Sequence, residues 1–202
     1  MTVEREKASY HHGDLRAALL SAAAAMLAEA GIEGFSLRQV AKRVGVSHSA
    51  PAHHFGDTQG LIAALAAEGF RRFTVAMRAR QALEPPDPRS QLIGSGIGYV
   101  EFAAAEPALF QLMFGSCWSR DPTPELAEAS EAAFHVLTDG VASLRGASPF
   151  EDPEAMAQVV GCWSIVHGYA KLMLAGQLEP MHGMPGLDRE TMLRRIIERA
   201  LG

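Results

Sequence analysis

The sequence predicts an all-α protein, in which a three-helix head with a helix-turn-helix is followed by a larger helical bundle. Apolar residues recur at three- and four-residue spacing along most of the chain, and Ala, Leu, Met, Gln, Arg and Glu fill the long runs. The alternation of Val, Ile and Thr with polar residues that a half-buried strand needs is absent from the sequence. Proline and glycine clusters at 84–89, 120–124, 146–153 and 180–186 separate the helical segments.

The head is predicted from three helices with clear stop signals. The first helix covers about 14–30 and buries one face, because its apolar residues follow the helical period. Ser36 is a good N-cap for a second helix over 37–44, and Gly45 ends that helix. A third short helix then runs to about Phe55.

A longer helix is predicted from about 57 to 80, before the proline-rich break at 84–89. Further helices are expected near 90–105, 107–115, 124–145, 152–177 and 188–201. We therefore divide the chain into a helix-turn-helix domain over 10–57, or about 11–71 with the start of the linker helix, and a helical domain over 58–202.

Charge is unevenly placed along the chain, whose formal net charge is −5. Residues 1–57 contain six basic and six acidic side chains, so the remaining residues have 12 basic and 17 acidic ones. A neutral head on an acidic body is compatible with nucleic-acid binding, and the net charge argues against binding through a bulk positive field. The first ten residues have no apolar core, and no run reaches the about 18 apolar residues of a membrane span. A cytoplasmic protein with Cys117 and Cys162 as reduced thiols is expected.

The segment 35–47 has the pattern of a helix-turn-helix. One helical face is formed by Leu37, Val40, Ala41 and Val44. Ala41 is small where a second helix must pass closely, Gly45 permits the sharp turn, and Val46 fills the space between the helices. In this motif the second helix enters the major groove.

Polar side chains on the expected recognition helix have the size to reach base edges or phosphates. These are Ser47, His48, Ser49, His53 and His54. Arg38, Lys42 and Arg43 on the preceding helix are placed to contact the DNA backbone.

These residues carry a family resemblance. Residues 10–70 resemble the DNA-binding domain of the TetR family of bacterial regulators, through the ungapped segment 31–47, then His54-Phe55 and Leu61. With this resemblance, the candidate DNA contacts are Arg38, Lys42, Ser47, His48, Ser49, Ala50, His53, His54 and Thr58. The family usually has an aromatic residue where this chain has Ala52 and often lysine where it has Thr58, so fewer phosphate contacts are expected.

A second, shorter resemblance lies in the body. The segment 163–168, Trp-Ser-Ile-Val-His-Gly, resembles the Trp…His-Gly signature of one class of ligand-binding domain in this family. Trp163 and His167 share a helical face, which fits either a core tryptophan beside a hydrogen-bonded histidine or the wall of a ligand cavity. The candidate pocket residues are Phe102, Phe110, Met113, Trp118, Phe134, Trp163 and His167, with plain core as the alternative for the aromatic and Met members.

The resemblance implies a homodimer formed by the last two helices, at about 152–177 and 188–201. Two heads would then meet successive major grooves about 34 Å apart on a palindromic operator, and a partly apolar small-molecule effector would release them. The histidines of the head lack the spacing of a metal site, and no nucleophile–base pair is found. No metal, cofactor or enzymatic activity is therefore expected. The rival reading is an all-helical small-molecule-binding protein or enzyme without a DNA function.

Overall fold

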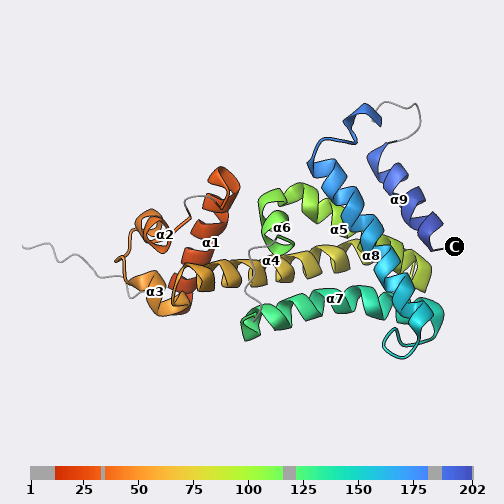
Figure 1. Cartoon of the computed structure of the whole chain (residues 1–202), viewed down its shortest axis with the longest axis horizontal. Helices are drawn as coiled ribbons and strands as arrows, with labels where there is room; N and C mark the ends of the chain where they lie inside the picture. Colours follow the sequence, from red (N-terminus) through yellow and green to blue (C-terminus); the bar gives the residue numbers. More distant parts are fainter. Residues whose placement is uncertain (1–11, 33–34, 116–121, 182–187, 202) are drawn as a thin grey trace, which may run out of the picture. The chain divides into compact units, whose positions relative to one another are not determined.

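The computed structural model describes residues 12–32, 35–115, 122–181 and 188–201, and in these ranges it contains helices and no strand (Figure 1). The predicted all-α fold class is confirmed. The chain forms two compact units, Met1–Leu65 and Ala66–Gly202, which are described separately below. Within the described ranges, no helix combines the length and apolar character needed to cross a membrane.

The first unit contains three helices and the first two turns of a fourth. They are α1 (His12–Ala30), α2 (Leu37–Val44), α3 (Ala50–Phe55) and the start of α4 (Thr58–Gln81). The predicted caps of α2 are present: the Ser36 side chain accepts from the backbone N–H of Gln39, and Gly45 adopts a left-handed conformation with φ of 77°. The core of this unit is made by Leu19, Ala23, Leu27, Val40, Ala41, Phe55 and Leu61.

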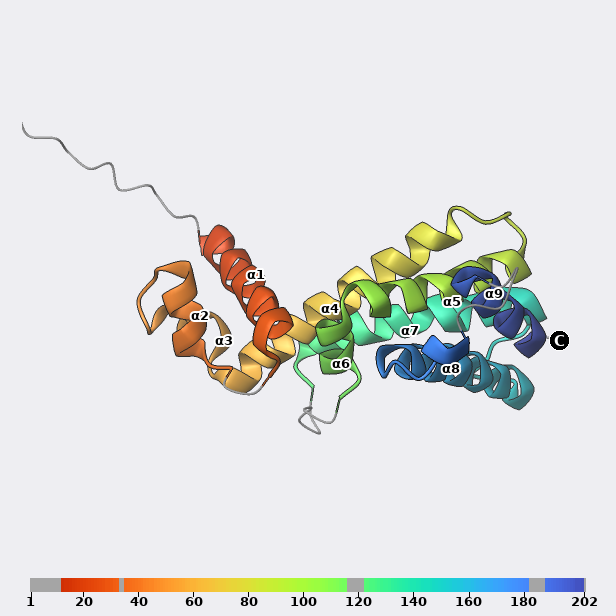
Figure 2. The same cartoon turned by 90° about the horizontal axis from the view of Figure 1, so that it is seen from above.

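The second unit is a helical bundle around α5 (Pro88–Ala105). The other helices are the rest of α4, α6 (Pro107–Met113), α7 (Pro124–Arg145), α8 (Pro153–Leu174), the short 3₁₀ helix η1 (Glu179–Met181) and α9 (Arg189–Ala200). Helix α5 packs against α6, α7, α8 and α9, and it lies between α4 and α8 in Figure 2. These elements match the segments expected from the sequence within a few residues.

Two glycines let α5 approach α4 closely. A Cβ added at Gly98 would lie 2.9 Å from the Met77 Cα and 2.9 Å from the Ala76 carbonyl oxygen. A Cβ added at Gly94, one turn earlier, would lie 3.1 Å from the Gln81 Cα. Because these neighbours are backbone atoms, only the absence of a side chain allows this separation.

An ion pair with a nearly buried carboxylate joins the segment that follows α4 to α9. The Glu84 side chain is only 8% exposed, and it accepts hydrogen bonds from both terminal nitrogens of Arg194 at 2.5 and 3.1 Å. Arg80 approaches the same carboxylate at 2.9 Å. The Arg194 guanidinium holds the pKa of the Glu84 carboxyl below its usual range.

Replacing this carboxylate by an amide, Glu84→Gln, is expected to lower the free energy of unfolding by about 2 kcal/mol at pH 7, because Arg194 and Arg80 lose the negative charge and one of the two oxygens that they contact. Since the folded pKa lies below the unfolded value of about 4.3, the contribution is complete above that value and is lost as the pH falls through the folded pKa. Urea denaturation at pH 7 and pH 3 checks both points, with the difference shrinking at pH 3. The control is Glu101→Gln, at an exposed carboxylate 3.5 Å from Arg80; equal losses in the two variants at pH 7 would contradict the prediction.

Candidate DNA-binding surface and ligand cavity

The helix-turn-helix is held together by a small apolar core. Val40 and Ala41 of α2 are fully buried, and Phe55 at the end of α3 is buried against the same core. Pro51 lies in the first turn of α3, where its missing N–H has no helical partner to lose, and its ring is buried. The core thus fixes α3 and leaves its outer face to solvent.

Most of the predicted DNA contacts lie on the solvent side of α2, the turn and α3. The exposed ones are Arg38, Lys42, Ser47, His48, Ser49 and His53. Ala50, His54 and Thr58 are half-buried, and the His54 ring lies 6.1 Å from the Phe55 ring, centroid to centroid. The structure therefore groups six of the nine candidates on accessible surface and places the other three partly in the packing of the head.

Arg43 is engaged within the head. Its guanidinium donates to both carboxylate oxygens of Glu29, at 2.5 and 2.6 Å, which joins α2 to the end of α1. This hydrogen bonding lowers the pKa of Glu29, so the carboxylate stays charged at neutral pH. Arg43 differs in this respect from the sequence expectation, which grouped it with Arg38 and Lys42 as a contact to the DNA backbone.

The turn between α3 and α4 depends on a glycine that the sequence analysis did not single out. A Cβ added at Gly60 would lie 1.9 Å from the Phe55 carbonyl oxygen, so no other residue fits without a backbone shift. The Gly60 N–H also donates to the Asp57 side chain at 2.8 Å, which caps the first turn of α4. This arrangement sets where α3 ends.

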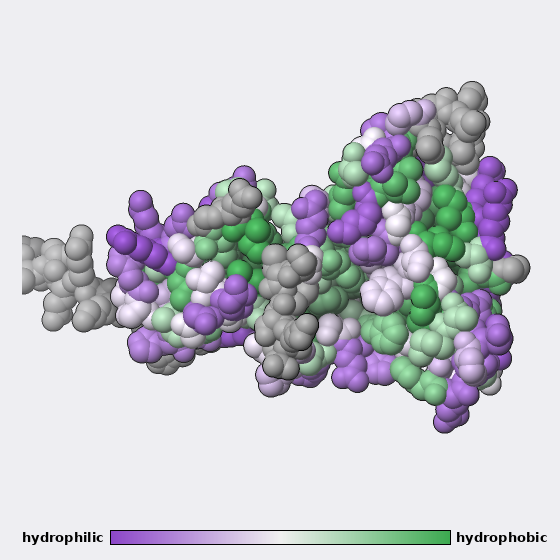
Figure 3. Space-filling model, in the orientation of Figure 1, coloured by the Kyte–Doolittle hydropathy of each residue, from purple (hydrophilic) through white to green (hydrophobic). Residues whose placement is uncertain are grey.

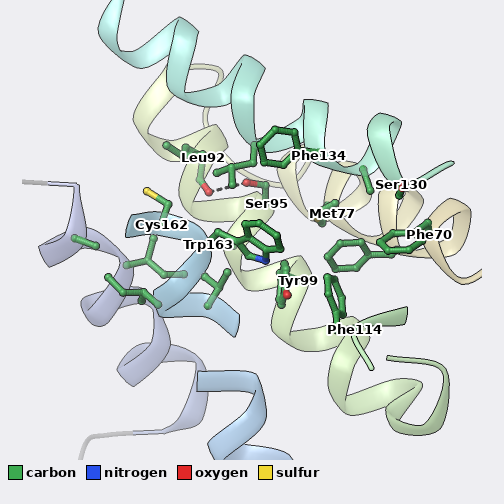
Figure 4. Close-up of a pocket in the computed structure, with 18 residues that line it drawn as sticks. Phe70, Met77, Leu92, Ser95, Tyr99, Phe114, Ser130, Phe134, Cys162 and Trp163 are labelled. Atoms are coloured by element: carbon green, nitrogen blue, oxygen red, sulfur yellow. Dashed lines mark hydrogen bonds between the residues drawn. The ribbon is translucent and has the colours of Figure 1, made fainter. Parts of the chain in front are cut away.

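A cavity of about 290 Å³, partly open to solvent, lies in the second unit (Figure 4). Its walls come from five helices and the residue that ends α6. They are Phe70, Phe73, Met77, Leu92, Ser95, Gly96, Tyr99, Phe114, Ser130, Ala133, Phe134, Leu137, Cys162, Trp163, Ile165, Val166, Ile197 and Ala200. In Figure 4, Trp163 and Tyr99 lie near the middle, with Phe70 and Phe114 toward one end and Leu92 and Cys162 toward the other.

The structure places the predicted pocket residues in different surroundings. Phe134 and Trp163 line the cavity. Phe102, Phe110 and Met113 do not: they are buried in the core among α4, α5 and α6. Their apolar period reflects helix packing, which looks the same in sequence as a cavity wall. Trp118 lies outside the described residues.

His167 is the remaining predicted pocket residue, and it acts through a neighbour. It does not line the cavity, but its Nδ1 lies 2.7 Å from the hydroxyl of Tyr99, which does. Burial raises the pKa of the Tyr99 hydroxyl far above its usual range. Burial, with a smaller contribution from the charge of Lys171, lowers the pKa of His167. Both groups are therefore neutral at pH 7, and the pair adds a polar but uncharged point to the wall.

Several cavity residues were not found from the sequence. Among them, Phe70, Phe73 and Met77 lie on α4 and Tyr99 lies on α5. These residues have the spacing of an ordinary buried helix face, so no local signal distinguishes them from core. Among the described side chains, no group of three or more His, Cys, Asp or Glu residues could hold a metal ion.

Two family models match the chain, one for each unit. The first is described as "Bacterial regulatory proteins, tetR family" and matches residues 19–65. The second is described as "Tetracyclin repressor-like, C-terminal domain" and matches residues 92–200, which is more than half of the chain. This chain belongs to the TetR family. The finer assignment of its TetR body to the Trp…His-Gly class stays a prediction.

Individual relatives agree with this assignment. The HTH-type transcriptional regulator BetI of Burkholderia ambifaria is 36% identical over 77 residues, which cover 38% of this TetR-family chain and only 40% of BetI. A protein of unknown function from Rhodococcus sp. RHA1 is 31% identical with a TM-score of 0.77, and the match covers 96% of this chain and 95% of that one. SCO4313, a protein described as regulatory, is 25% identical with a TM-score of 0.71 over 98% of both chains.

Proposed function

We propose that this TetR-family protein is a DNA-binding transcriptional regulator of the cytoplasm, and that it acts as a ligand-responsive homodimeric repressor. The observation that carries the proposal is the set of exposed polar and basic side chains on the outer face of α2, the turn and α3, whose inner faces form a buried core. The matched segment of BetI, an HTH-type transcriptional regulator, supports the same reading. In the proposed complex, α3 enters the major groove of a palindromic operator.

Each exposed residue has a role that suits its chemistry. Arg38 and Lys42 on α2 are cations that contact phosphates, since charge-assisted hydrogen bonds to phosphate are strong. His48 and His53 offer ring nitrogens, and Ser47 and Ser49 offer hydroxyls, to base edges or phosphates. Ala50, His54 and Thr58 are half-buried, so they lie at the edge of this DNA-binding surface and contribute to the packing of the helix-turn-helix.

We propose that the homodimer forms through α8 and α9, so that a second copy of the chain covers both helices. A Cβ added at Gly161 or Gly168 would meet nothing within 4 Å, so this face is open to a neighbouring helix. Val160 and Leu172 on the same helix are 53% and 43% exposed, so α8 presents apolar side chains that a partner helix could bury. In Figure 3, green and pale atoms lie among purple ones over the region that α8 occupies in Figure 1.

Gly161→Glu is expected to shift the protein from dimer to monomer, because a charged side chain replaces a hydrogen atom on a face that a helix covers. Glutamate has the higher helix propensity, so a weakened α8 cannot explain the change. Light scattering after size-exclusion chromatography measures the mass of each variant. The control is Ala104→Glu, at an exposed position on α5, which should stay dimeric. A dimeric Gly161→Glu protein would contradict the proposed interface.

The cavity offers a route from ligand to DNA. Phe70, Phe73 and Met77 line it from α4, and the same helix begins at Thr58, directly after the helix-turn-helix. We propose that a bound effector shifts α4 and thereby changes the spacing between the two helix-turn-helix heads of the dimer. DNA and effector would then oppose each other through one coupling free energy.

DNase I footprinting on the DNA that flanks the chain's own gene tests the proposed function. The expected result is a protected palindrome whose half-sites are about one helical turn, or a multiple of it, apart. A scrambled duplex of equal length is the control. Absence of any protected sequence at low salt would contradict the regulator proposal in favour of a protein that only binds small molecules.

A further inference from the structure

We propose that the cavity selects an uncharged ligand that combines a ring with a short aliphatic part. This inference rests on the proposed function, because it names the ligand class of the effector site. The described residues that line the cavity include no Asp, Glu, Lys, Arg or His. An ion bound against such a wall would lose part of its hydration without gaining a charged partner, so a charged ligand is disfavoured.

The three hydroxyls of the wall are already committed inside the protein. The Ser95 hydroxyl donates to the Leu92 carbonyl oxygen at 2.8 Å, and the Ser130 hydroxyl donates to the Ala127 carbonyl oxygen at 3.0 Å. The Tyr99 hydroxyl is held at 2.7 Å by His167. These hydroxyls keep spare lone pairs, and the other polar groups of the wall are the uncharged Cys162 thiol and Trp163 indole N–H, which suits a single neutral polar group and not an ionic one.

Four aromatic side chains of the wall, Phe70, Phe73, Tyr99 and Phe114, pack edge to face and do not form a cage for a cation. Phe70 and Phe114 meet edge to face at 5.7 Å between centroids, and Phe73 meets Tyr99 edge to face at 4.8 Å. Phe73 also meets Phe114 edge to face, at 6.0 Å. Rings packed on one another in this way use their faces for ring edges, whereas cation binding needs several free ring faces around one point. A quaternary or primary ammonium is therefore disfavoured as well.

Size and shape narrow the class further. An apolar cavity of about 150 Å³ holds a single benzene ring, so 290 Å³ has room for about two units of that size. The aromatic residues Phe70 and Phe114 lie toward one end in Figure 4, and Leu92 lies toward the other. Ile197 and Ala200 of α9 add further aliphatic wall. A ring with an alkyl chain matches both parts.

Three probes with the same phenyl ring and four-carbon chain test the charge preference on the full-length protein. They are 4-phenylbutan-1-ol, 4-phenylbutanoate and 4-phenylbutylammonium, titrated at pH 7 by isothermal calorimetry in the absence of DNA. The alcohol is expected to bind at least tenfold more tightly than either ion. Equal or tighter binding of the carboxylate or the ammonium would overturn the proposal, and so would no binding of any probe up to its solubility limit.

A wall variant tests whether the probes occupy this cavity. Ser130→Asp places a carboxylate in the wall, and Ser130→Asn is its neutral control of the same size. The aspartate variant should improve ammonium binding relative to the alcohol at least tenfold, while the asparagine variant should leave the ratio unchanged. Circular dichroism checks that both variants fold. An unchanged ratio in a folded Ser130→Asp protein would overturn the assignment of the site.

These results are independent of DNA binding. If the alcohol is preferred and no DNA is protected in the footprint, the regulator proposal fails while the ligand class stands. If a DNA sequence is protected and an ion is the preferred probe, the ligand class fails while the regulator proposal stands.

Discussion

Arg38→Ala combined with His53→Ala is expected to weaken operator binding about 100-fold at constant salt, which corresponds to about 2.7 kcal/mol. Arg38 is an exposed cation of α2, and His53 is an exposed polar side chain of α3. The double substitution therefore removes one proposed DNA contact from each helix of the helix-turn-helix. The slope of the logarithm of affinity against the logarithm of salt concentration should also fall by about one unit, because a phosphate contact is lost. Fluorescence anisotropy on the footprinted duplex measures both quantities.

Arg43→Ala is the matched control for the charge. It removes the same side chain from the same helix, but its guanidinium is paired with Glu29 at 2.5 and 2.6 Å. We expect a loss of affinity under about threefold in this variant, because the paired group contributes less to the phosphates. Circular dichroism verifies that each variant is folded. Unchanged affinity in a folded Arg38→Ala, His53→Ala protein would show that another surface reads the DNA.

Phe110→Ala is expected to have the largest effect on stability, lowering the free energy of unfolding by about 4 kcal/mol. The Phe110 side chain is fully buried, and its ring packs against Phe114 and Tyr99 at centroid distances of 4.9 and 5.7 Å. The His167 ring lies 5.6 Å away on α8. The neighbours of Phe110 come from several elements of the unit and cannot all collapse into the space that the ring leaves. Thermal and urea unfolding measure the loss, with a decrease in Tm of about 10 °C.

Phe134→Ala separates core from cavity wall. Phe134 is half-buried and already faces the cavity, so its removal enlarges an existing space and is expected to cost less than about 2 kcal/mol. Its main effect should be on binding of 4-phenylbutan-1-ol. If Phe134→Ala destabilised the protein as much as Phe110→Ala, the division of aromatic residues into core and wall would be wrong.

The fold could be predicted from the sequence because the residues that begin and end its helices lie next to those ends in the sequence. Ser36 and Gly45 bound α2, and the structure has both caps as predicted. Gly146 ends α7 in a left-handed conformation, and Asp188 caps α9 through the Thr191 N–H. Such signals depend on a few neighbouring residues and on backbone geometry that only certain side chains allow.

The cavity could be predicted only in part, because its walls depend on distant segments. Tyr99 lines the cavity because of how α5 packs against other helices. Phe110 has equally apolar neighbours in the sequence, but it is buried in the core. Helical periodicity reports which face is buried, but it does not report whether that face meets side chains or space. The pairings Glu84–Arg194 and Arg43–Glu29 are likewise set by tertiary packing, since each joins residues from different helices or segments.

The central claim is that the exposed face of α2 and α3 reads a DNA sequence, and a competition titration tests it most directly. The full-length protein is titrated into labelled duplex from its own flanking DNA, and the complex is then challenged with unlabelled flanking duplex or unlabelled scrambled duplex at several salt concentrations. We predict that the flanking duplex competes at least 1,000-fold better than the scrambled one, as specific regulators do. Equal competition by the two duplexes at every salt concentration would contradict the account.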